Sequence, residues 1–173
     1  MKLPKLVITD IDGVWTDGGM YYDQSGNEWK KFNTSDSAGV LFLRYLKIPV
    51  LIMTGENTAI VERRAAKLKI EYLEQGVKNK LQKAREYCEK LQIDLSEMAY
   101  IGDDINDIEL LSNVGISACP SNAPVYVKSR AQIILEVAGG SGAFRAFVEH
   151  ILHECKSFDQ VLNMYLNQQD LNQ

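Results

Sequence analysis

Leu6-Val7-Ile8-Thr9-Asp10-Ile11-Asp12-Gly13-Val14 is the stretch that decides the fold. It begins as a short run of branched apolar residues, which is typical of a buried parallel strand, and it ends on two carboxylates and a glycine. Open α/β sheets bind their ligands beyond the carboxyl ends of such strands. Asp10 and Asp12 point the same way in an extended segment, and Gly13 lets the backbone turn close to a ligand. Because two carboxylates this close need a cation or a shared proton, we expect a site here.

The composition is that of an ordinary globular domain. The chain has 173 residues, 46% of them hydrophobic and 24% charged, so we expect residues 1–173 to form a single domain with a substantial core. The net charge of −4 argues against broad binding to nucleic acid or to an anionic membrane. No apolar run has the length of a membrane span, and the first residues lack the apolar region of a signal peptide. We therefore expect a cytoplasmic protein that binds neither nucleic acid nor a membrane.

Strand-like and helix-like segments alternate along the chain, which indicates a parallel sheet with helices on both faces. After the first strand, the expected strands are 48–53, 70–73, 98–101, 115–118 and 132–135. The expected helices are 35–47, 57–68, 79–91, 106–113, 143–155 and 157–167. A hairpin rich in aromatic residues is expected within 14–32, and Ser35 or Asp36 is expected to cap the first helix. Within 139–173, a glycine-rich segment, Gly139-Gly140-Ser141-Gly142, precedes the last two helices.

Polar side chains follow four of the expected strands or begin the helices after them. The set is Asp10, Asp12, Thr54, Lys80, Asp103, Asp104 and Asp107. Lys80 lies at a predicted helix N-terminus, where the helix dipole disfavours a cation by a few tenths of a kcal/mol to about 1 kcal/mol, so an anionic group is expected beside it. Thr54 precedes a helix N-terminus whose free amides suit a phosphate. Asp10 and Asp103 together would form an oxygen-rich pocket that suits Mg²⁺ better than zinc or copper.

This order of motifs, Asp-x-Asp-Gly, Thr-Gly, Lys and Gly-Asp-Asp-x-x-Asp, resembles the haloacid dehalogenase superfamily of phosphohydrolases over nearly the whole chain. The stretches 9–14, 76–80, 99–104 and 139–143 resemble its branch of cap-less sugar-acid phosphatases. That branch includes the phosphatases of 3-deoxy-D-manno-octulosonate 8-phosphate and of nine-carbon keto-sugar acids. The resemblance implies a Rossmann-like α/β fold with a β-hairpin flap and no separate cap domain.

The resemblance also implies the catalytic roles. Asp10 would be the nucleophile that takes the phosphoryl group, and Asp12 the acid that protonates the leaving alkoxide and then the base that activates water. Thr54 and Lys80 would neutralise the phosphoryl oxygens. The implied reaction is Mg²⁺-dependent hydrolysis of a phosphomonoester through an aspartyl-phosphate intermediate.

The resemblance implies a metal site at the same place. Mg²⁺ would be held by Asp10, Asp103 and the backbone carbonyl of Asp12. Asp104 and Asp107 would lie behind these ligands and orient them.

The expected substrate is a keto-deoxy sugar acid phosphate, with a nine-carbon 9-phosphate favoured over the eight-carbon 8-phosphate. Gly55 and Glu56 follow Thr54 at the rim, while Arg64 and Lys67 share one stripe of the next helix. The two cations could hold the substrate carboxylate, and Glu56 could accept hydrogen bonds from sugar hydroxyls. The resembled eight-carbon enzymes typically have a basic residue after Thr-Gly, so Glu56 favours the nine-carbon substrate.

Two alternatives belong to other functional classes. A phospho-acceptor receiver module also combines acidic residues, a threonine and a lysine, but its lysine comes last in the chain, whereas Lys80 precedes Asp103. A catalytically silent, oligomerising domain would not need Asp12.

We also expect a homo-oligomer, with a tetramer favoured by the resemblance. The chain has no segment long enough to form an independent lid domain beside Thr54 or Asp12. The hairpin 14–32 offers a surface for self-association, and residues 139–145 could reach over a neighbour's pocket as a lid.

Overall fold

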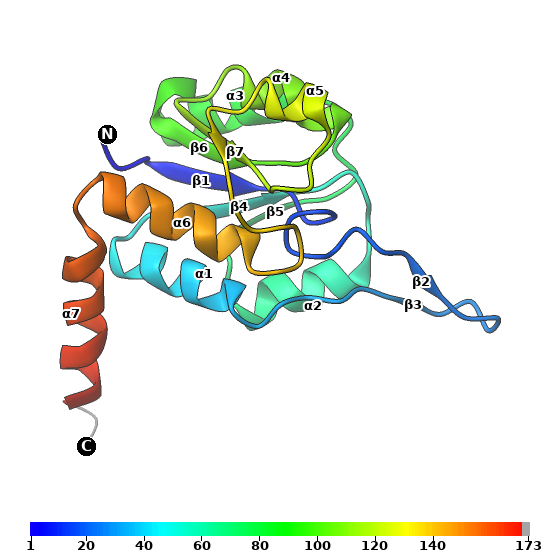
Figure 1. Ribbon diagram of the computed structural model, residues 1–173, viewed down its shortest axis with the longest axis horizontal. Coiled ribbons are helices and arrows are strands. Elements are labelled where there is room, and N and C mark those ends of the chain that lie inside the picture. Colours follow the sequence, from blue (N-terminus) through cyan, green and yellow to red (C-terminus); the bar gives the residue numbers. More distant parts are fainter. Residues whose placement is uncertain (171–173) are drawn as a thin grey trace.

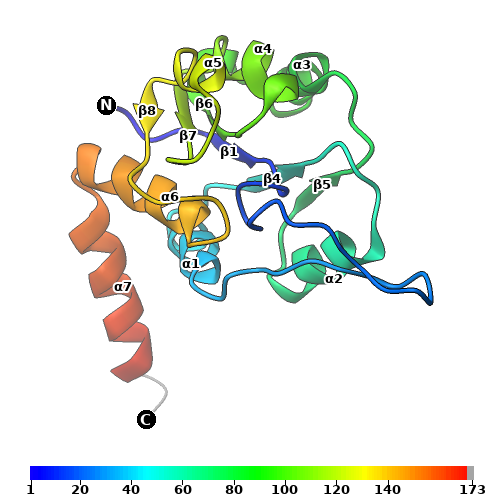
Figure 2. The same cartoon turned by 45° about the vertical axis from the view of Figure 1, so that its right-hand side comes forward.

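β1 (Leu6–Thr9) lies inside the main sheet, and all of its side chains are fully buried. It pairs in parallel with β4 (Val50–Met53) on one side and with β6 (Met98–Ile101) on the other. Helices cover both faces, as Figures 1 and 2 show for residues 1–170, the part of the chain that the computed structural model describes. Because β1 has a strand on each edge and helices above and below, its run of apolar residues is uninterrupted.

The sheet of the described residues has six parallel strands in the order β5-β4-β1-β6-β7-β8. The outer strands are β5 (Tyr72–Glu74), β7 (Ile116–Cys119) and β8 (Ile133–Ile134). The predicted fold class is thereby confirmed: an α/β, Rossmann-like parallel sheet with a hairpin flap and no separate cap. The prediction of a single domain over 1–173 stays a prediction.

Alternate residues of β1 enter two separate hydrophobic cores. Leu6 and Ile8 pack in the core under α3, α4 and α5, whereas Val7 packs in the core under α1, α2 and α6. The helices of the first core are α3 (Lys80–Leu91), α4 (Ile108–Leu111) and α5 (Val125–Lys128). Those of the second are α1 (Asp36–Tyr45), α2 (Ala59–Lys67) and α6 (Ala143–Glu154), followed by α7 (Phe158–Asp170). This period of two is the geometry of a strand.

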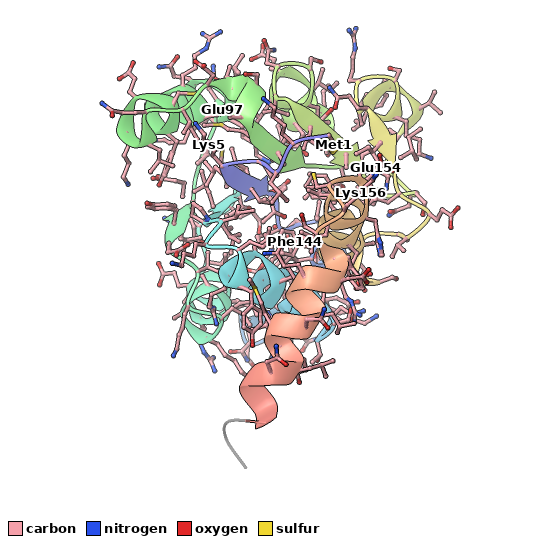
Figure 3. The ribbon with its side chains drawn as sticks, turned by 90° about the vertical axis from the view of Figure 1, so that its left-hand side faces the viewer. Met1, Lys5, Glu97, Phe144, Glu154 and Lys156 are labelled. Atoms are coloured by element: carbon pink, nitrogen blue, oxygen red, sulfur yellow. The ribbon has the colours of Figure 1, made fainter. Side chains whose placement is uncertain are left out.

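The core between the sheet and α6 is built around two stacked rings. Phe144 lies in the interior, and its ring stacks on that of Trp15, with 4.7 Å between centroids (Figure 3). Away from this core, Lys5 and Glu97 lie side by side (Figure 3) and form an ion pair of 2.7 Å that joins the chain before β1 to the chain before β6. The first contact holds the loop after β1 against α6, and the second holds the chain that enters β1.

The predicted hairpin is present and projects from the body of the molecule (Figure 1). Its strands are β2 (Tyr21–Tyr22) and β3 (Glu28–Trp29), and a bridge between Thr16 and Phe32 closes its base. Tyr22 and Trp29 are exposed. A two-stranded hairpin with exposed aromatic side chains has little of its own to stabilise it.

Ser35 occupies the N-cap position of α1, as predicted, but the side-chain hydrogen bond that a capping residue usually makes is not formed. Asp36 is buried and its Oδ1 accepts a hydrogen bond from the Arg145 N–H, 3.0 Å away in the first turn of α6. Asp36 therefore satisfies a free amide of another helix, because α1 and α6 pack together, which sequence spacing does not reveal.

Two further helix predictions need correction. Instead of one helix over 106–113, the chain forms a 3₁₀ turn, η2 (Ile105–Asp107), and then the short α4. The Asp104 and Asp107 carboxylates accept backbone N–H groups there, which favours the tighter turn. The short α5 and the 3₁₀ turn η1 (Leu95–Glu97) were not predicted.

The glycine-rich segment is not a plain linker. Gly140 N–H donates to Val14 O over 3.0 Å, and Gly139 N–H donates to Asn122 Oδ1 over 2.9 Å. The segment thus supports the loop after β1 within its own chain. Its suggested role as a lid over a neighbour stays a prediction. Within residues 1–170, no helix combines the length and apolar character needed to cross a bilayer.

Candidate active site

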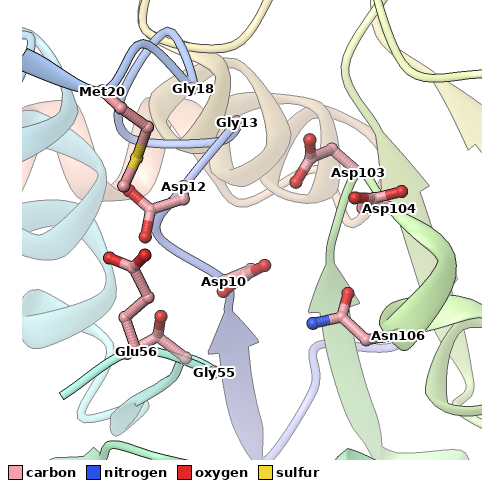
Figure 4. A pocket seen from close by; sticks show the side chains of 11 residues that line it. Asp10, Asp12, Gly13, Gly18, Met20, Gly55, Glu56, Asp103, Asp104 and Asn106 are labelled. Atoms are coloured by element: carbon pink, nitrogen blue, oxygen red, sulfur yellow. The ribbon is translucent and has the colours of Figure 1, made fainter.

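The carboxyl ends of β1, β4 and β6 surround a cavity of about 260 Å³ (Figure 4). Its lining residues are Asp10, Asp12, Gly13, Gly18, Met20, Thr54, Gly55, Glu56, Asp103, Asp104 and Asn106. Polar residues predicted from three separate strand ends therefore meet in one place, because parallel strands bring their carboxyl ends to the same edge of the sheet.

Lys80 lies beneath this cavity as a buried cation. Its Nζ is 2.9 Å from Asp10 Oδ2 and 2.5 Å from Asp107 Oδ1, and it lies 3.2 Å from the Tyr100 hydroxyl. Burial alone would lower the pKa of Lys80, but Asp10 and Asp107 outweigh this and raise it. The predicted anionic partner of this helix-initial lysine is thus a pair of carboxylates, and Lys80 stays charged beside Asp10.

Asp10 and Asp103 face each other across the ends of β1 and β6. Burial raises the pKa of Asp10 to about 7, against the opposing effect of Lys80. Burial, together with the charges of Asp10 and Asp107, raises the pKa of Asp103 to about 8. Asp103 Oδ1 is buried and has no hydrogen-bond partner among the described residues. When both carboxyl groups are ionised, the single positive charge of Lys80 does not balance their two negative charges. Their oxygens suit a hard divalent cation such as Mg²⁺.

Oxygens of Asp10, Asp103 and Asp107 lie within 4.8 Å of one another, so geometry alone would allow all three to hold a metal. However, both oxygens of Asp107 are already occupied. Oδ1 accepts hydrogen bonds from Lys80 and from the Tyr100 hydroxyl, and Oδ2 accepts the N–H groups of Asp103 and Asp104. Asp107 therefore orients the loop that presents Asp103, and Asp10 and Asp103 are the carboxylates that fit the metal.

Gly13 is required at its position by contact as well as by conformation. Its φ is +83°, and a Cβ there would overlap the Asp103 carboxylate. The loop after β1 contacts the loop after β6 at Gly13. Only glycine leaves room there for the Asp103 side chain.

Asp12 is held by the hairpin. Lys30 Nζ donates to Asp12 Oδ1 over 2.7 Å and to Glu56 Oε2 over 2.6 Å, and the Thr16 hydroxyl lies 3.3 Å from Asp12 Oδ1. Burial lowers the pKa of Lys30, but hydrogen bonds to Asp12 and Glu56 outweigh this and raise it. Glu56 is therefore in the cavity wall, as predicted, but as an ion-pair partner of Lys30.

Arg64 and Lys67 do not line this cavity. They lie with Phe32 along a separate hollow on α2. Arg64 Nη2 donates to Asn33 O over 3.2 Å, and its guanidinium lies over the rings of Trp15 and Phe32 at 5.7 and 5.5 Å. Their predicted role in binding the substrate stays a prediction, and within one chain they are part of a different surface.

Known proteins provide an independent comparison. The sequence model described as haloacid dehalogenase-like hydrolase matches residues 48–147. The chain is 38% identical to the 3-deoxy-D-manno-octulosonate 8-phosphate phosphatase of Escherichia coli K12 over 148 residues, which cover 86% of the chain and 79% of that relative. The chain belongs to the haloacid dehalogenase-like hydrolase family.

Solved structures agree with this assignment. A probable phosphatase of the YrbI family from Pseudomonas syringae superposes with a TM-score of 0.91 at 39% identity, covering 95% of this chain and 94% of that one. The 3-deoxy-D-manno-octulosonate 8-phosphate phosphatase of Moraxella catarrhalis superposes with a TM-score of 0.90 at 34% identity, covering 94% of this chain and 93% of that one. The latter was solved in complex with a magnesium ion, a phosphate ion and KDO.

Several residues of the site were not predicted. Gly18, Met20 and Asn106 line the cavity, and Thr16, Lys30 and Tyr100 contact its acidic residues or Lys80. Tyr100 left a sequence clue, since a hydroxyl in a buried strand must find a polar partner. Lys30 and Thr16 left none, because their contacts with Asp12 depend on how the hairpin folds back over the strand ends. The roles predicted for Asp10, Asp12, Thr54, Lys80 and Asp103 remain predictions.

Proposed function

We propose that this chain is a Mg²⁺-dependent phosphatase that hydrolyses a keto-deoxy sugar acid phosphate, with 3-deoxy-D-manno-octulosonate 8-phosphate as the first candidate. The observation behind this proposal is the cavity in which Asp10, Asp12 and Asp103 converge above the buried Lys80. The E. coli relative, named for this eight-carbon substrate, supports the choice. The relatives do not support the nine-carbon substrate favoured by the sequence, and the ion pair of Glu56 with Lys30 weakens the argument that Glu56 selects it.

In the proposed reaction, an Asp10 oxygen attacks the phosphorus atom while the bond between phosphorus and the sugar oxygen breaks. Asp12 gives its proton to that oxygen, so a sugar alcohol leaves and an aspartyl phosphate forms. Asp12 then takes a proton from a water molecule that attacks the phosphorus, which releases phosphate and restores Asp10. Both carboxyls return to their starting states, and the net change is the hydrolysis of one ester bond.

The remaining residues of the site have electrostatic roles in this proposal. Lys80 balances the charge of Asp10 before attack and of the phosphoryl oxygens during transfer, and Thr54 is available as a hydroxyl donor at the cavity wall. Asp10, Asp103 and the carbonyl of Asp12 would hold Mg²⁺, which supplies further neutralisation of the phosphoryl charge when bound. Asp107 keeps the loop of Asp103 in place because its Oδ2 accepts the N–H groups of Asp103 and Asp104.

A substrate panel tests the proposal. The purified chain is assayed with the eight-carbon 8-phosphate, a nine-carbon 9-phosphate and a simple hexose phosphate, in Mg²⁺ and in EDTA. We expect the highest kcat/KM for the eight-carbon substrate, no turnover in EDTA, and a loss of roughly 10³-fold or more in Asp10→Asn. Asp17→Asn is the matched control, because Asp17 is in the same loop but pairs with Tyr21 and Lys31.

The outcomes separate the parts of the proposal. Undiminished turnover in Asp10→Asn would refute the mechanism. A higher kcat/KM for the nine-carbon substrate would restore the substrate favoured by the sequence and leave the mechanism intact.

A further inference from the structure

Lys30 is a charged residue that contacts two residues of the cavity wall, Asp12 and Glu56, and the proposed mechanism gives it no role. It follows β3, and its side chain is only 1% exposed although it belongs to a projecting hairpin. Its Nζ lies 2.7 Å from Asp12 Oδ1 and 2.6 Å from Glu56 Oε2. An ammonium group is withdrawn from water at a substantial cost unless its partners compensate, so contacts of this quality indicate a defined position.

Both arms of the hairpin hold the same oxygen of Asp12. The Thr16 hydroxyl, on the first arm, lies 3.3 Å from Asp12 Oδ1, and Lys30 approaches that oxygen from the second arm. The bridge between Thr16 and Phe32 joins these arms at their base. Asp12 Oδ2, in contrast, is buried and has no hydrogen-bond partner among the described residues. The hairpin thus fixes one oxygen of the carboxyl group and leaves the other for a reaction partner.

The positive charge of Lys30 is balanced by its neighbours. Two carboxyl groups, Asp12 and Glu56, share this one ammonium, and Glu28 Oε1 lies 3.8 Å from it. When Asp12 is protonated, as its acid role requires, the Glu56 carboxylate still balances the charge of Lys30. The immediate group is therefore not positive overall, so it does not form a site for the phosphate of a substrate. Lys80, on the other side of Asp10, has the position that suits the phosphoryl group.

We propose that Lys30 is a positioning residue for Asp12: together with Thr16 it holds Oδ1, so that Oδ2 is presented to the oxygen of the leaving group. This inference rests on the proposed function, in which Asp12 protonates that oxygen. Because proton transfer depends on the orientation of the acid, loss of Lys30 should impair substrates whose leaving group needs a proton. Substrates whose leaving group is stable as an anion should be affected much less.

The test compares two leaving groups. Wild type, Lys30→Met, Lys30→Gln and Lys30→Arg are assayed with the sugar acid phosphate preferred in the panel, which leaves as an alkoxide, and with p-nitrophenyl phosphate, which leaves as a stabilised anion. We expect Lys30→Met and Lys30→Gln to lose about 10- to 100-fold in kcat on the sugar phosphate and about 3-fold or less on the aryl phosphate. Lys30→Arg should recover most of the loss. Lys31→Met, in the exposed neighbouring lysine that pairs with Asp17, should change neither rate.

A double-mutant cycle then tests whether Lys30 acts through Asp12. It adds Asp12→Asn and the double variant Asp12→Asn/Lys30→Met to the wild type and Lys30→Met. If Lys30 acts through Asp12, the double variant should match Asp12→Asn on the sugar phosphate within about 3-fold. Equal losses of Lys30→Met and Lys30→Gln on both substrates, or an additional tenfold loss in the double variant, would overturn the assignment.

Thermal unfolding midpoints of all variants identify a folding defect, and the ratio of the two rates within one variant does not depend on the folded fraction. A wild-type chain that hydrolyses neither substrate would instead overturn the proposed function, and the role of Lys30 with it.

Discussion

Asp10 and Asp103 determine how the site responds to pH. Burial, with neighbouring charge, raises the pKa of Asp10 to about 7 and that of Asp103 to about 8 in the metal-free chain. Both carboxyls therefore bind protons below these values, and a divalent cation must displace them. We expect the affinity for Mg²⁺ to increase from pH 6 to pH 8, by up to about tenfold per pH unit for each proton displaced.

Calorimetric titration with Mg²⁺ in two buffers of different ionisation enthalpy measures both the affinity and the protons released. Asp103→Asn should lower the affinity and the proton release together. An affinity that stays constant from pH 6 to pH 8 would contradict the assignment of these two carboxyls as the ligands.

Gly13 provides a second prediction at the residue scale. Gly13→Ala should weaken Mg²⁺ binding strongly, because the new methyl group must displace the Asp103 carboxylate. Gly26→Ala is the matched control: Gly26 has the same φ of +83°, but a Cβ there meets nothing within 4 Å. Both variants should lose about 1 kcal/mol of unfolding free energy from the left-handed backbone. Only Gly13→Ala should change the Mg²⁺ titration, and an equal change in both would show that strain alone is responsible.

At the scale of elements, the sequence predicted well what local pattern determines. β1, β4 and β6 follow from apolar runs, and α3 follows from helical spacing of apolar residues after Asn79, whose side chain the structure shows to cap it. Elements held by distant contacts were not predictable. The short α5 has too few residues for a helical period. The partners of Lys30 and of Asp36 depend on which loops and helices pack together.

Asp36 leads to a prediction about the packing of α1 against α6. Burial raises its pKa to about 6 from 3.8, although the Arg145 N–H and Arg64 oppose the shift. A carboxyl with a raised folded-state pKa contributes stability that is present below the unfolded pKa and is lost as pH rises through the folded pKa. The wild type should therefore lose unfolding free energy relative to Asp36→Asn between pH 4.5 and pH 8, by about 2 kcal/mol.

Urea denaturation of both chains at the two pH values measures this difference. Asp159→Asn is the control, because it makes the same substitution in the first turn of a helix, α7, but at an exposed position. A difference between wild type and Asp36→Asn that is the same at both pH values would contradict the prediction.

At the scale of the whole molecule, the position of Arg64 and Lys67 links substrate binding to assembly. Both lie along α2 beside Phe32, outside the cavity that contains Asp10 and Asp12. If these cations bind a substrate carboxylate, as the sequence suggested, a second copy of the chain must bring them to the cavity. Sequence pattern placed them correctly on one face of a helix, but it could not tell which cavity that face meets.

The projecting hairpin is the surface on which we expect copies to meet. Tyr22 and Trp29 are 64% and 51% exposed there, and a two-stranded hairpin gains little stability without a partner surface. We therefore predict a homo-oligomer, with a tetramer as the expected state, measured by light scattering at micromolar concentration.

The double variant Tyr22→Ser/Trp29→Ser should lower the molar mass of the particle, whereas Val125→Ser, at an 81% exposed position on α5, should not. If neighbouring chains supply Arg64 and Lys67, kcat/KM for the sugar phosphate should fall with the mass, while the rate on p-nitrophenyl phosphate should change little. A monomeric wild type, or a hairpin variant that keeps the full mass, would contradict this arrangement.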